Sequence, residues 1–189
     1  MCEEVGKAEI QIDYLVNNAG SGVFGRFMET DIEDELSINE LNMMSPTILC
    51  KHFLPQLLRR RGKIMNVASV AAFQPGPYMA VYYATKAYLL SLSEAMNTEL
   101  KGTGVTVTTF CPGPTQSGFQ DAAGMSSSGL VKGKRLPSAH DVGVAGYRAL
   151  MEGKSVFIPG FMNKVMVGSV RFAPRAWIQR VVMAMSAPR

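Results

Sequence analysis

The sequence has few cysteines and no long hydrophobic run, and each absence excludes a class of protein. Its three cysteines, Cys2, Cys50 and Cys111, lie far apart and form no CxxC pair. They indicate neither a disulfide framework nor a zinc site, so we expect no metal and a cytoplasmic location. No stretch reaches the roughly 20 uninterrupted apolar residues that a membrane-spanning helix needs. Glu3 and Glu4, with no apolar core after them, also argue against a secretory signal.

Acidic residues are absent from the end of the chain, after Glu152. Six of the 19 basic residues follow that position, so the first 152 residues hold 13 basic against 15 acidic groups, a net charge of −2. The formal charge of +4 therefore arises in the tail rather than in the body of the protein. No internal element carries a stripe of Lys and Arg, so we expect no nucleic-acid partner.

The hydrophobic pattern alternates between strand-like and helical segments along the 189 residues. Strand-like runs cover residues 12–17, 63–68, 105–110 and 155–158, and helical patterns cover 31–60, 79–101 and 138–152. Strands that alternate with helices predict an α/β fold, a doubly wound parallel sheet. A capping-box spacing at residues 30–33 predicts the start of the first long helix, and Gly62 predicts its end. Residues 115–137 have no period and predict a long loop.

The segment VYYATKA, residues 81–87, contains the most specific candidate for chemistry. Tyr82 and Lys86 are four residues apart on a predicted helix and so share one face. A free tyrosine has a pKa of about 10, and a neighbouring ammonium group would lower that pKa toward the working range of an acid or base. Tyr83 lacks such a partner, because Ala87 stands four residues after it.

Other polar positions fall where an α/β sheet places its site. Ser69 ends the strand KIMNVAS, Asn42 lies in the long helix, and Pro112-Gly113 follows the third strand. The turn Asn-Asn-Ala-Gly at residues 17–20 follows the first strand. Together with the Tyr-Lys pair, these motifs resemble the short-chain dehydrogenase/reductase family in order, spacing and placement, from residue 12 to residue 160. The short-chain fold is Rossmann-like.

The resemblance implies an NAD(P)-dependent oxidoreductase that interconverts a carbonyl and an alcohol by hydride transfer. Tyr82 would be the general acid of carbonyl reduction and the base of alcohol oxidation. Lys86 would lower the pKa of that tyrosine and bind the nicotinamide ribose. Ser69 would hydrogen-bond the substrate oxygen. Asn42 would support a water that links Lys86 to solvent.

The resemblance also implies cofactor contacts at the two turns. The turn after the first strand would lie near the adenosine ribose, and the Pro-Gly turn would approach the nicotinamide. The family's usual threonine five positions after the proline is a serine here, and a nearby threonine could assist it. With Tyr82 and Lys86, the expected cofactor-binding residues are Asn17, Ala19, Gly20, Pro112, Gly113, Thr115 and Ser117.

One feature of the family is missing, the glycine-rich TGxxxGxG loop that binds the pyrophosphate. Only residues 1–11 precede the first strand, and GSGVFG at residues 20–25 does not open a strand-turn-helix unit. We therefore expect an N-terminally truncated member with an incomplete sheet, whose strand at 12–17 is an exposed edge. The residue that selects between NAD and NADP would also be missing; we favour NADP.

Residues 1–160 are expected to form the partial cofactor-binding domain, and residues 161–189 a basic amphipathic tail. After Pro174 the tail offers one face with apolar residues and another with Arg175 and Arg180; the apolar residues are Trp177, Ile178, Val181, Val182 and Met185. Three alternatives stay open for this tail. It packs on the domain or on a subunit partner, it caps the substrate pocket, or it makes peripheral contact with an anionic membrane.

The function expected is therefore oxidoreduction of a small hydrophobic carbonyl or alcohol, by a chain that is a homodimer or tetramer when intact. The helices at 31–60 and 79–101 commonly form the dimer interface in this family. The alternative is a catalytically silent fragment that acts as a scaffold or partner-binding module. A hydrolase that pairs Ser69 with His52 or His140 is disfavoured, because no GxSxG motif is present.

Overall fold

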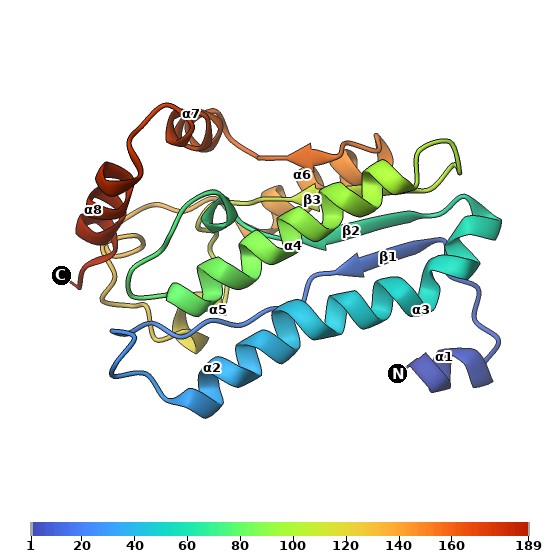
Figure 1. Cartoon of the computed structure of the whole chain (residues 1–189), viewed down its shortest axis with the longest axis horizontal. Coiled ribbons are helices and arrows are strands. Elements are labelled where there is room, and N and C mark those ends of the chain that lie inside the picture. The colour runs from blue at the N-terminus through green and yellow to red at the C-terminus, as the bar shows by residue number, and fades with distance from the viewer. Residues whose placement is uncertain (1, 189) are drawn as a thin grey trace.

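Four parallel strands form the centre of the structure, in the order β1-β2-β3-β4 (Figure 1). The computed structural model describes residues 2–188. The strands are β1 (Tyr14–Asn17), β2 (Lys63–Val67), β3 (Thr106–Phe110) and β4 (Val156–Phe157). The helices are α1 (Cys2–Lys7), α2 (Ile32–Asn39), η1 (Glu40–Met44), α3 (Ser45–Arg60), η2 (Val70–Phe73), α4 (Ala80–Glu99), α5 (Phe119–Ala122), α6 (Ala139–Met151), α7 (Phe161–Val170) and α8 (Arg175–Ser186). The predicted α/β fold with a parallel sheet is confirmed.

Helices cover both faces of the sheet at its central strands, where β2 and β3 bury side chains on both faces. Leu15, Ile64 and Val107 lie in register across β1, β2 and β3 and pack with α3 in one core cluster. On the opposite face, Met65 packs with α6 through Leu150. Figure 1 shows α4 crossing one face of the sheet while α6 lies behind it. Parallel strands with both faces covered are the arrangement that βαβ connections produce.

The first long helix is continuous from residue 32 to residue 60 but contains one π-helical turn, η1. Asp31 caps its start by accepting hydrogen bonds from the backbone N–H groups of residues 33 and 34, so the cap is not Thr30. The helix ends at Arg60, as predicted, and Gly62 N–H donates to the Leu57 carbonyl at 2.9 Å. The left-handed residue is Arg61, with φ of 53°, while Gly62 also allows close packing, because a Cβ there would lie 2.5 Å from the Leu57 side chain.

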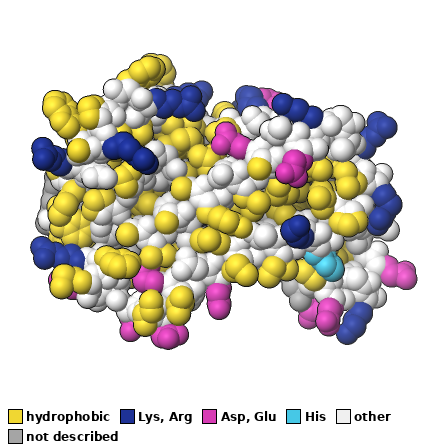
Figure 2. All heavy atoms as spheres, viewed as in Figure 1, with side chains coloured by type: hydrophobic (Ala, Val, Ile, Leu, Met, Phe, Trp, Pro, Cys, Tyr) yellow, Lys and Arg dark blue, Asp and Glu magenta, His cyan; other side chains and the backbone are white. Residues whose placement is uncertain are grey.

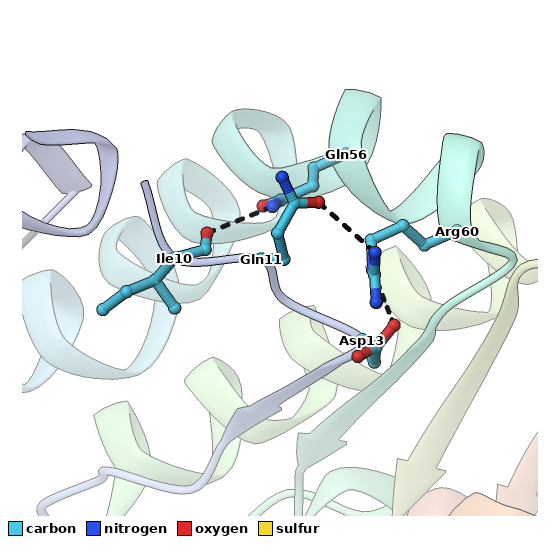
Figure 3. A network of polar contacts seen from close by, with 5 residues as sticks. All are labelled: Ile10, Gln11, Asp13, Gln56 and Arg60. Atoms are coloured by element: carbon cyan, nitrogen blue, oxygen red, sulfur yellow. Dashed lines mark hydrogen bonds and ion pairs between the residues drawn. The ribbon is translucent and has the colours of Figure 1, made fainter. Parts of the chain in front are cut away.

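The segment before β1 is tied to the end of α3 by side chains (Figure 3). Arg60 Nε forms an ion pair with Asp13 Oδ1 at 2.6 Å, and this hydrogen bond lowers the pKa of Asp13. The Arg60 guanidinium also donates to Gln11 Oε1 at 3.3 Å, and Gln56 Nε2 donates to the Ile10 carbonyl at 3.2 Å. These contacts set the entry of the chain into β1.

Strand β1 forms one edge of the sheet, as predicted. Leu15 and Asn17 point into the core, whereas Tyr14 and Val16 are 50% and 45% exposed. Among residues 2–188 no strand pairs with the outer side of β1. Its backbone groups and its apolar side chains are thus available to a further strand.

Two predicted segments differ in detail. The expected loop at residues 115–137 contains the single-turn helix α5 but is otherwise turns and bends. The tail forms two helices, as predicted, yet its apolar residues do not share one face. Ile178 and Val182 are buried against the domain, while Trp177 and Val181 are 67% and 57% exposed.

A test of the core compares two adjacent leucines of α3. Leu57 is fully buried in the cluster over β1, β2 and β3, whereas Leu58 is 37% exposed. We expect Leu57→Ala to lower the free energy of unfolding by about 2–5 kcal/mol, because it removes buried surface and leaves a cavity. Leu58→Ala should change it by about 0.5 kcal/mol or less. Urea unfolding measures both, and equal losses would contradict the packing described.

Candidate active site

The candidate site lies where the carboxyl ends of β1, β2 and β3 meet at one edge of the sheet. β1 ends at Asn17, Ser69 follows β2, and Pro112 follows β3. The pairing of β2 with β3 continues past both strands, because Ala68 N–H donates to the Phe110 carbonyl at 2.7 Å. The structure thus brings together three turns that are far apart in the sequence, at the position where α/β sheets bind ligands.

Lys86 and Tyr82 occupy one face of α4 and point toward the end of β2. Lys86 Nζ donates to the carbonyl oxygen of Val67 at 2.8 Å and lies 5.7 Å from the centroid of the Tyr82 ring. The lysine side chain is only 4% exposed. The predicted pair is therefore assembled, with the ammonium group held by the last residue of β2.

Tyr82 sits in an apolar environment. Its ring lies 5.3 Å from that of Phe119, and a Cβ on Gly22 would lie 3.2 Å from the Tyr82 ring. Burial raises the pKa of Tyr82 to about 12, while the neighbouring Ser69 hydroxyl acts in the opposite direction. The predicted lowering of this pKa by Lys86 is thus wrong for the protein alone, because desolvation of the phenolate outweighs its polar neighbours.

The pKa of Lys86 moves in the opposite sense. Burial lowers it from 10.5 to about 8, and the effect of the Cys111 thiol opposes that shift. At neutral pH the phenol of Tyr82 therefore keeps its proton, and the amine of Lys86 can gain or lose one near pH 8. A neutral acid beside a group that exchanges protons near the working pH is suited to general acid–base chemistry.

Ser69 joins two of the turns. Its hydroxyl accepts a hydrogen bond from Ala71 N–H at 3.1 Å, which caps η2, and donates to the Pro112 carbonyl at 3.4 Å. Val70 N–H donates to the same carbonyl at 3.0 Å. These bonds fix the serine beside the tyrosine at the site.

Asn42 lies on the π-helical turn η1, an irregularity that is frequent at functional sites. Its Nδ2 donates to the Ser21 carbonyl at 2.9 Å and to Thr85 Oγ1 at 3.0 Å, and its Oδ1 accepts from Ser21 N–H at 3.0 Å. The amide is fully used in holding the turn after β1 against α4. That Asn42 supports a water molecule linking Lys86 to solvent stays a prediction. The role of Thr85 was not predicted, because nothing in its spacing distinguishes it.

Asn17 belongs to a buried polar network rather than to an open surface. Its Nδ2 donates to Asn66 Oδ1 at 2.7 Å, and Asn66 Nδ2 donates to Ser93 Oγ at 2.8 Å. Its own Oδ1 is buried without a partner among the described residues. Asn66 was overlooked in the sequence, although an asparagine inside the apolar strand KIMNV is a signal of such a network.

The remaining predicted cofactor residues line the turns after β1 and β3. Gly20 allows close packing, since a Cβ there would lie 3.2 Å from both Lys86 Nζ and Asn42 Oδ1. A Cβ on Gly113 would lie 2.8 Å from Asn163 Nδ2 of α7. The Thr115 hydroxyl donates a hydrogen bond to the Gly113 carbonyl, and the Ser117 hydroxyl accepts one from Phe119 N–H. Ala19 is exposed to solvent. Their contacts with a cofactor stay predictions.

Comparison with known proteins identifies the family. The profile of the short chain dehydrogenases matches residues 1–126. The chain belongs to this family. A curated relative, the uncharacterized oxidoreductase YvrD of Bacillus subtilis, is 38% identical over 130 residues, which are 64% of this chain and 49% of YvrD. The matched region thus spans about half the length of this relative.

Solved structures agree with the assignment to short-chain dehydrogenases. A short chain dehydrogenase from Burkholderia cenocepacia, in complex with NADP, is 26% identical; the likeness covers 97% of this chain and 75% of that one, with a TM-score of 0.79. A short-chain dehydrogenase/reductase from Burkholderia phymatum, in complex with NAD, is 22% identical over all of this chain and 74% of that one, with a TM-score of 0.76. The second likeness supports the fold alone.

Burial of Lys86 predicts a measurable dependence of stability on pH. The pKa of Lys86 is about 8 in the folded protein, below its ordinary 10.5, so the unfolded chain binds more protons between these values. Folding stability should therefore rise as the pH is raised through this window. Below pH 8, burial of the Lys86 charge lowers the free energy of unfolding by on the order of 3 kcal/mol.

We therefore expect Lys86→Met to be more stable than the parent at neutral pH, by an amount that shrinks as the pH rises toward 10.5. The Val67 carbonyl loses its donor in the variant at every pH, so the slope of the difference with pH, rather than its size, reports the titration of Lys86. Urea unfolding over this pH range measures it. A difference that does not vary with pH would show that the ammonium is not desolvated.

Proposed function

We propose that the chain carries the catalytic half of an NAD(P)-dependent oxidoreductase that interconverts a carbonyl and an alcohol. One observation supports this most strongly: the Lys86 ammonium and the Ser69 hydroxyl both lie beside the half-buried side chain of Tyr82. The Tyr-Lys pair and the serine come from α4 and from the end of β2, so the fold itself assembles them. The family and its oxidoreductase relatives support the same reaction class.

The residues fit the nicotinamide end of the cofactor. An ammonium group has three N–H donors, and Lys86 gives one to the Val67 carbonyl, which leaves two for ribose hydroxyls. Gly20 lies next to the Lys86 ammonium, since a Cβ there would be 3.2 Å from Nζ. When bound, the nicotinamide supplies or accepts the hydride. We favour NADP over NAD, because the solved neighbour with the higher identity holds NADP.

In carbonyl reduction the three side chains then have separate tasks. The Ser69 hydroxyl turns its proton from the Pro112 carbonyl to the substrate oxygen and holds that oxygen next to Tyr82. The phenol of Tyr82 gives its proton to that oxygen as the carbonyl carbon receives the hydride. The phenolate that remains is stabilised by the charge of Lys86 and regains its proton through that amine. In alcohol oxidation each proton moves in the opposite direction.

The surroundings of Tyr82 favour a small apolar substrate. Phe24 and Phe119 pack in the same cluster as the tyrosine, and Met79 lies next to Gly22. A carbonyl compound with hydrophobic substituents could contact this cluster without leaving a polar group unpaired.

The outer faces of α3 and α4 carry exposed apolar side chains, including Ile48, which supports the proposed homodimer or tetramer.

A catalytically silent scaffold is the second candidate. Before β1, residues 2–13 contain only the short helix α1 and no glycine-rich turn between a strand and a helix. The described residues that precede the first strand of the sheet therefore offer the cofactor pyrophosphate no cradle of backbone N–H groups. Cofactor binding would then depend on the ribose and nicotinamide contacts alone.

Cofactor binding separates the two candidates. We expect the chain to bind NADPH or NADH with low affinity, because only part of the cofactor finds partners. A titration monitored by the nicotinamide fluorescence measures this affinity. Lys86→Met should abolish it, since the ribose hydroxyls lose their donors. A folded sample that binds neither cofactor would favour the scaffold. Tight binding would show that the pyrophosphate has a site we have not described.

Adjacent tyrosines provide a matched test of the reaction. With saturating cofactor and a panel of hydrophobic ketones, Tyr82→Phe should lower kcat by about 10²–10⁴-fold, because the proton donor is lost. Tyr83→Phe should retain most activity, since Tyr83 packs in the cluster that faces α8. An equal loss in both variants would contradict the role of Tyr82, and so would full activity of Tyr82→Phe.

A further inference from the structure

Helices α7 and α8 lie together at the end of the molecule opposite α1 (Figure 1). We propose that their outer surface, called here the tail surface, docks on an anionic phospholipid membrane. It is defined by two sets of exposed residues. The basic set is Lys164, Arg171, Arg175 and Arg180, and the apolar set is Phe161, Met162, Phe172, Trp177 and Val181. The proposal stands apart from the proposed catalytic activity.

The inner faces of both helices are already used by the domain. Ile178 and Val182 of α8 are buried with Tyr83 and Met79, and Val167 of α7 is 8% exposed. Packing on the domain, one of the alternatives for the tail, therefore accounts for these residues. It leaves the outer faces without a partner among residues 2–188.

The two helices and the turn between them expose large apolar side chains. Phe172, in the turn, is 90% exposed; Phe161 and Met162 of α7 are 78% and 74% exposed, and Trp177 of α8 is 67% exposed. Exposed aromatic residues on an amphipathic helical segment are typical of segments that lie at a membrane interface, with the ring at the level of the lipid headgroups.

The charge of the tail surface selects the partner. Residues 153–188 contain no acidic side chain, and within the described part of the chain no carboxylate forms an ion pair with Arg171, Arg175 or Arg180. Figure 2 shows Lys and Arg side chains next to hydrophobic ones over this end of the molecule. Such a surface complements lipid headgroups that carry negative charge, with about 1 kcal/mol for each basic residue near the membrane.

An open groove runs along α8 on the side away from Trp177 and Val181, because residues 175, 179 and 183 lie on the opposite face of this helix. It has a volume of about 860 Å³ and lies between α8, the first turns of α4 and residues 72–77. Arg175 and Arg180 line it together with apolar side chains such as Phe73 and Met183. A guanidinium group binds a phosphate through two parallel hydrogen bonds, so two arginines beside an apolar wall suit a phospholipid.

A second copy of the chain fits this surface less well. An isologous contact would place the same basic residues of two tails against each other without any acid between them. A bilayer brings negative charge and apolar volume at once. No helix of residues 2–188 is long and apolar enough to cross a membrane, so the contact would be one of a surface.

The test uses the full chain and Trp177, its only tryptophan. Vesicles of phosphatidylcholine alone are compared with vesicles that also contain phosphatidylglycerol. We expect sedimentation with the anionic vesicles only, with a blue shift of the Trp177 emission, and loss of both in high salt because ions screen the attraction. No binding to anionic vesicles at low salt would overturn the proposal.

Charge variants make the test specific. Arg175→Gln with Arg180→Gln should weaken binding about 30-fold, the equivalent of about 2 kcal/mol. The control pair Lys51→Gln with Lys101→Gln removes two exposed charges outside the tail surface and should leave binding unchanged. Equal weakening in both pairs would show a general charge effect and overturn the proposal.

A third variant probes the apolar part without changing charge. Phe172→Ser keeps the fold, since this side chain is almost fully exposed, and should reduce both sedimentation and the blue shift. Light scattering on the same samples records the oligomeric state. If the arginine pair or Phe172→Ser dissociates an oligomer and leaves lipid binding intact, the tail surface is a subunit contact and the membrane proposal is wrong.

Discussion

The burial of a single ammonium group, that of Lys86, is the constraint on which the site depends. Its charge lies at the end of β2 and is held by the Val67 carbonyl, which is free because the strand ends there. A glycine at residue 20 leaves room for this nitrogen, since a Cβ there would lie 3.2 Å from it. Asn42 holds the turn after β1 against α4 through Ser21 and Thr85. A desolvated lysine is tolerated because its hydrogen-bonding neighbours are fixed by the sheet.

Polar side chains continue this arrangement through the interior. Asn17, Asn66 and Ser93 form one chain of hydrogen bonds from β1 through β2 to α4, and Asn42 with Thr85 forms another from η1 to α4. Buried networks of this kind specify one arrangement of elements more strictly than apolar contacts do. They fix α4 relative to the strand ends, which is what positions Tyr82.

Much of this could be predicted from the sequence, because hydrophobic period and residue spacing report local structure. They placed the parallel sheet, the helix that carries Tyr82 and Lys86, and the two tail helices. They could not report desolvation, and for that reason the direction of the pKa shift of Tyr82 was wrong. Period alone also failed to separate Trp177 from Ile178, since only the packed domain shows which side of α8 is buried. The π-helical turn at Asn42 has no signal in residue type.

Tyr82 and Tyr83 are neighbours in sequence, yet their rings serve different parts of the molecule. Tyr83 is a buried member of the cluster that contains Ile178 and Val182 of the tail, whereas Tyr82 lies half-buried at the border of that cluster, next to Lys86. In evolutionary terms, two adjacent codons are then under separate selection. The proposed role of Tyr82 as proton donor constrains position 82, whereas substitutions at position 83 must change together with the sequence of α8. Divergence of the tail among related chains should therefore be recorded at position 83 and not at the proposed proton donor.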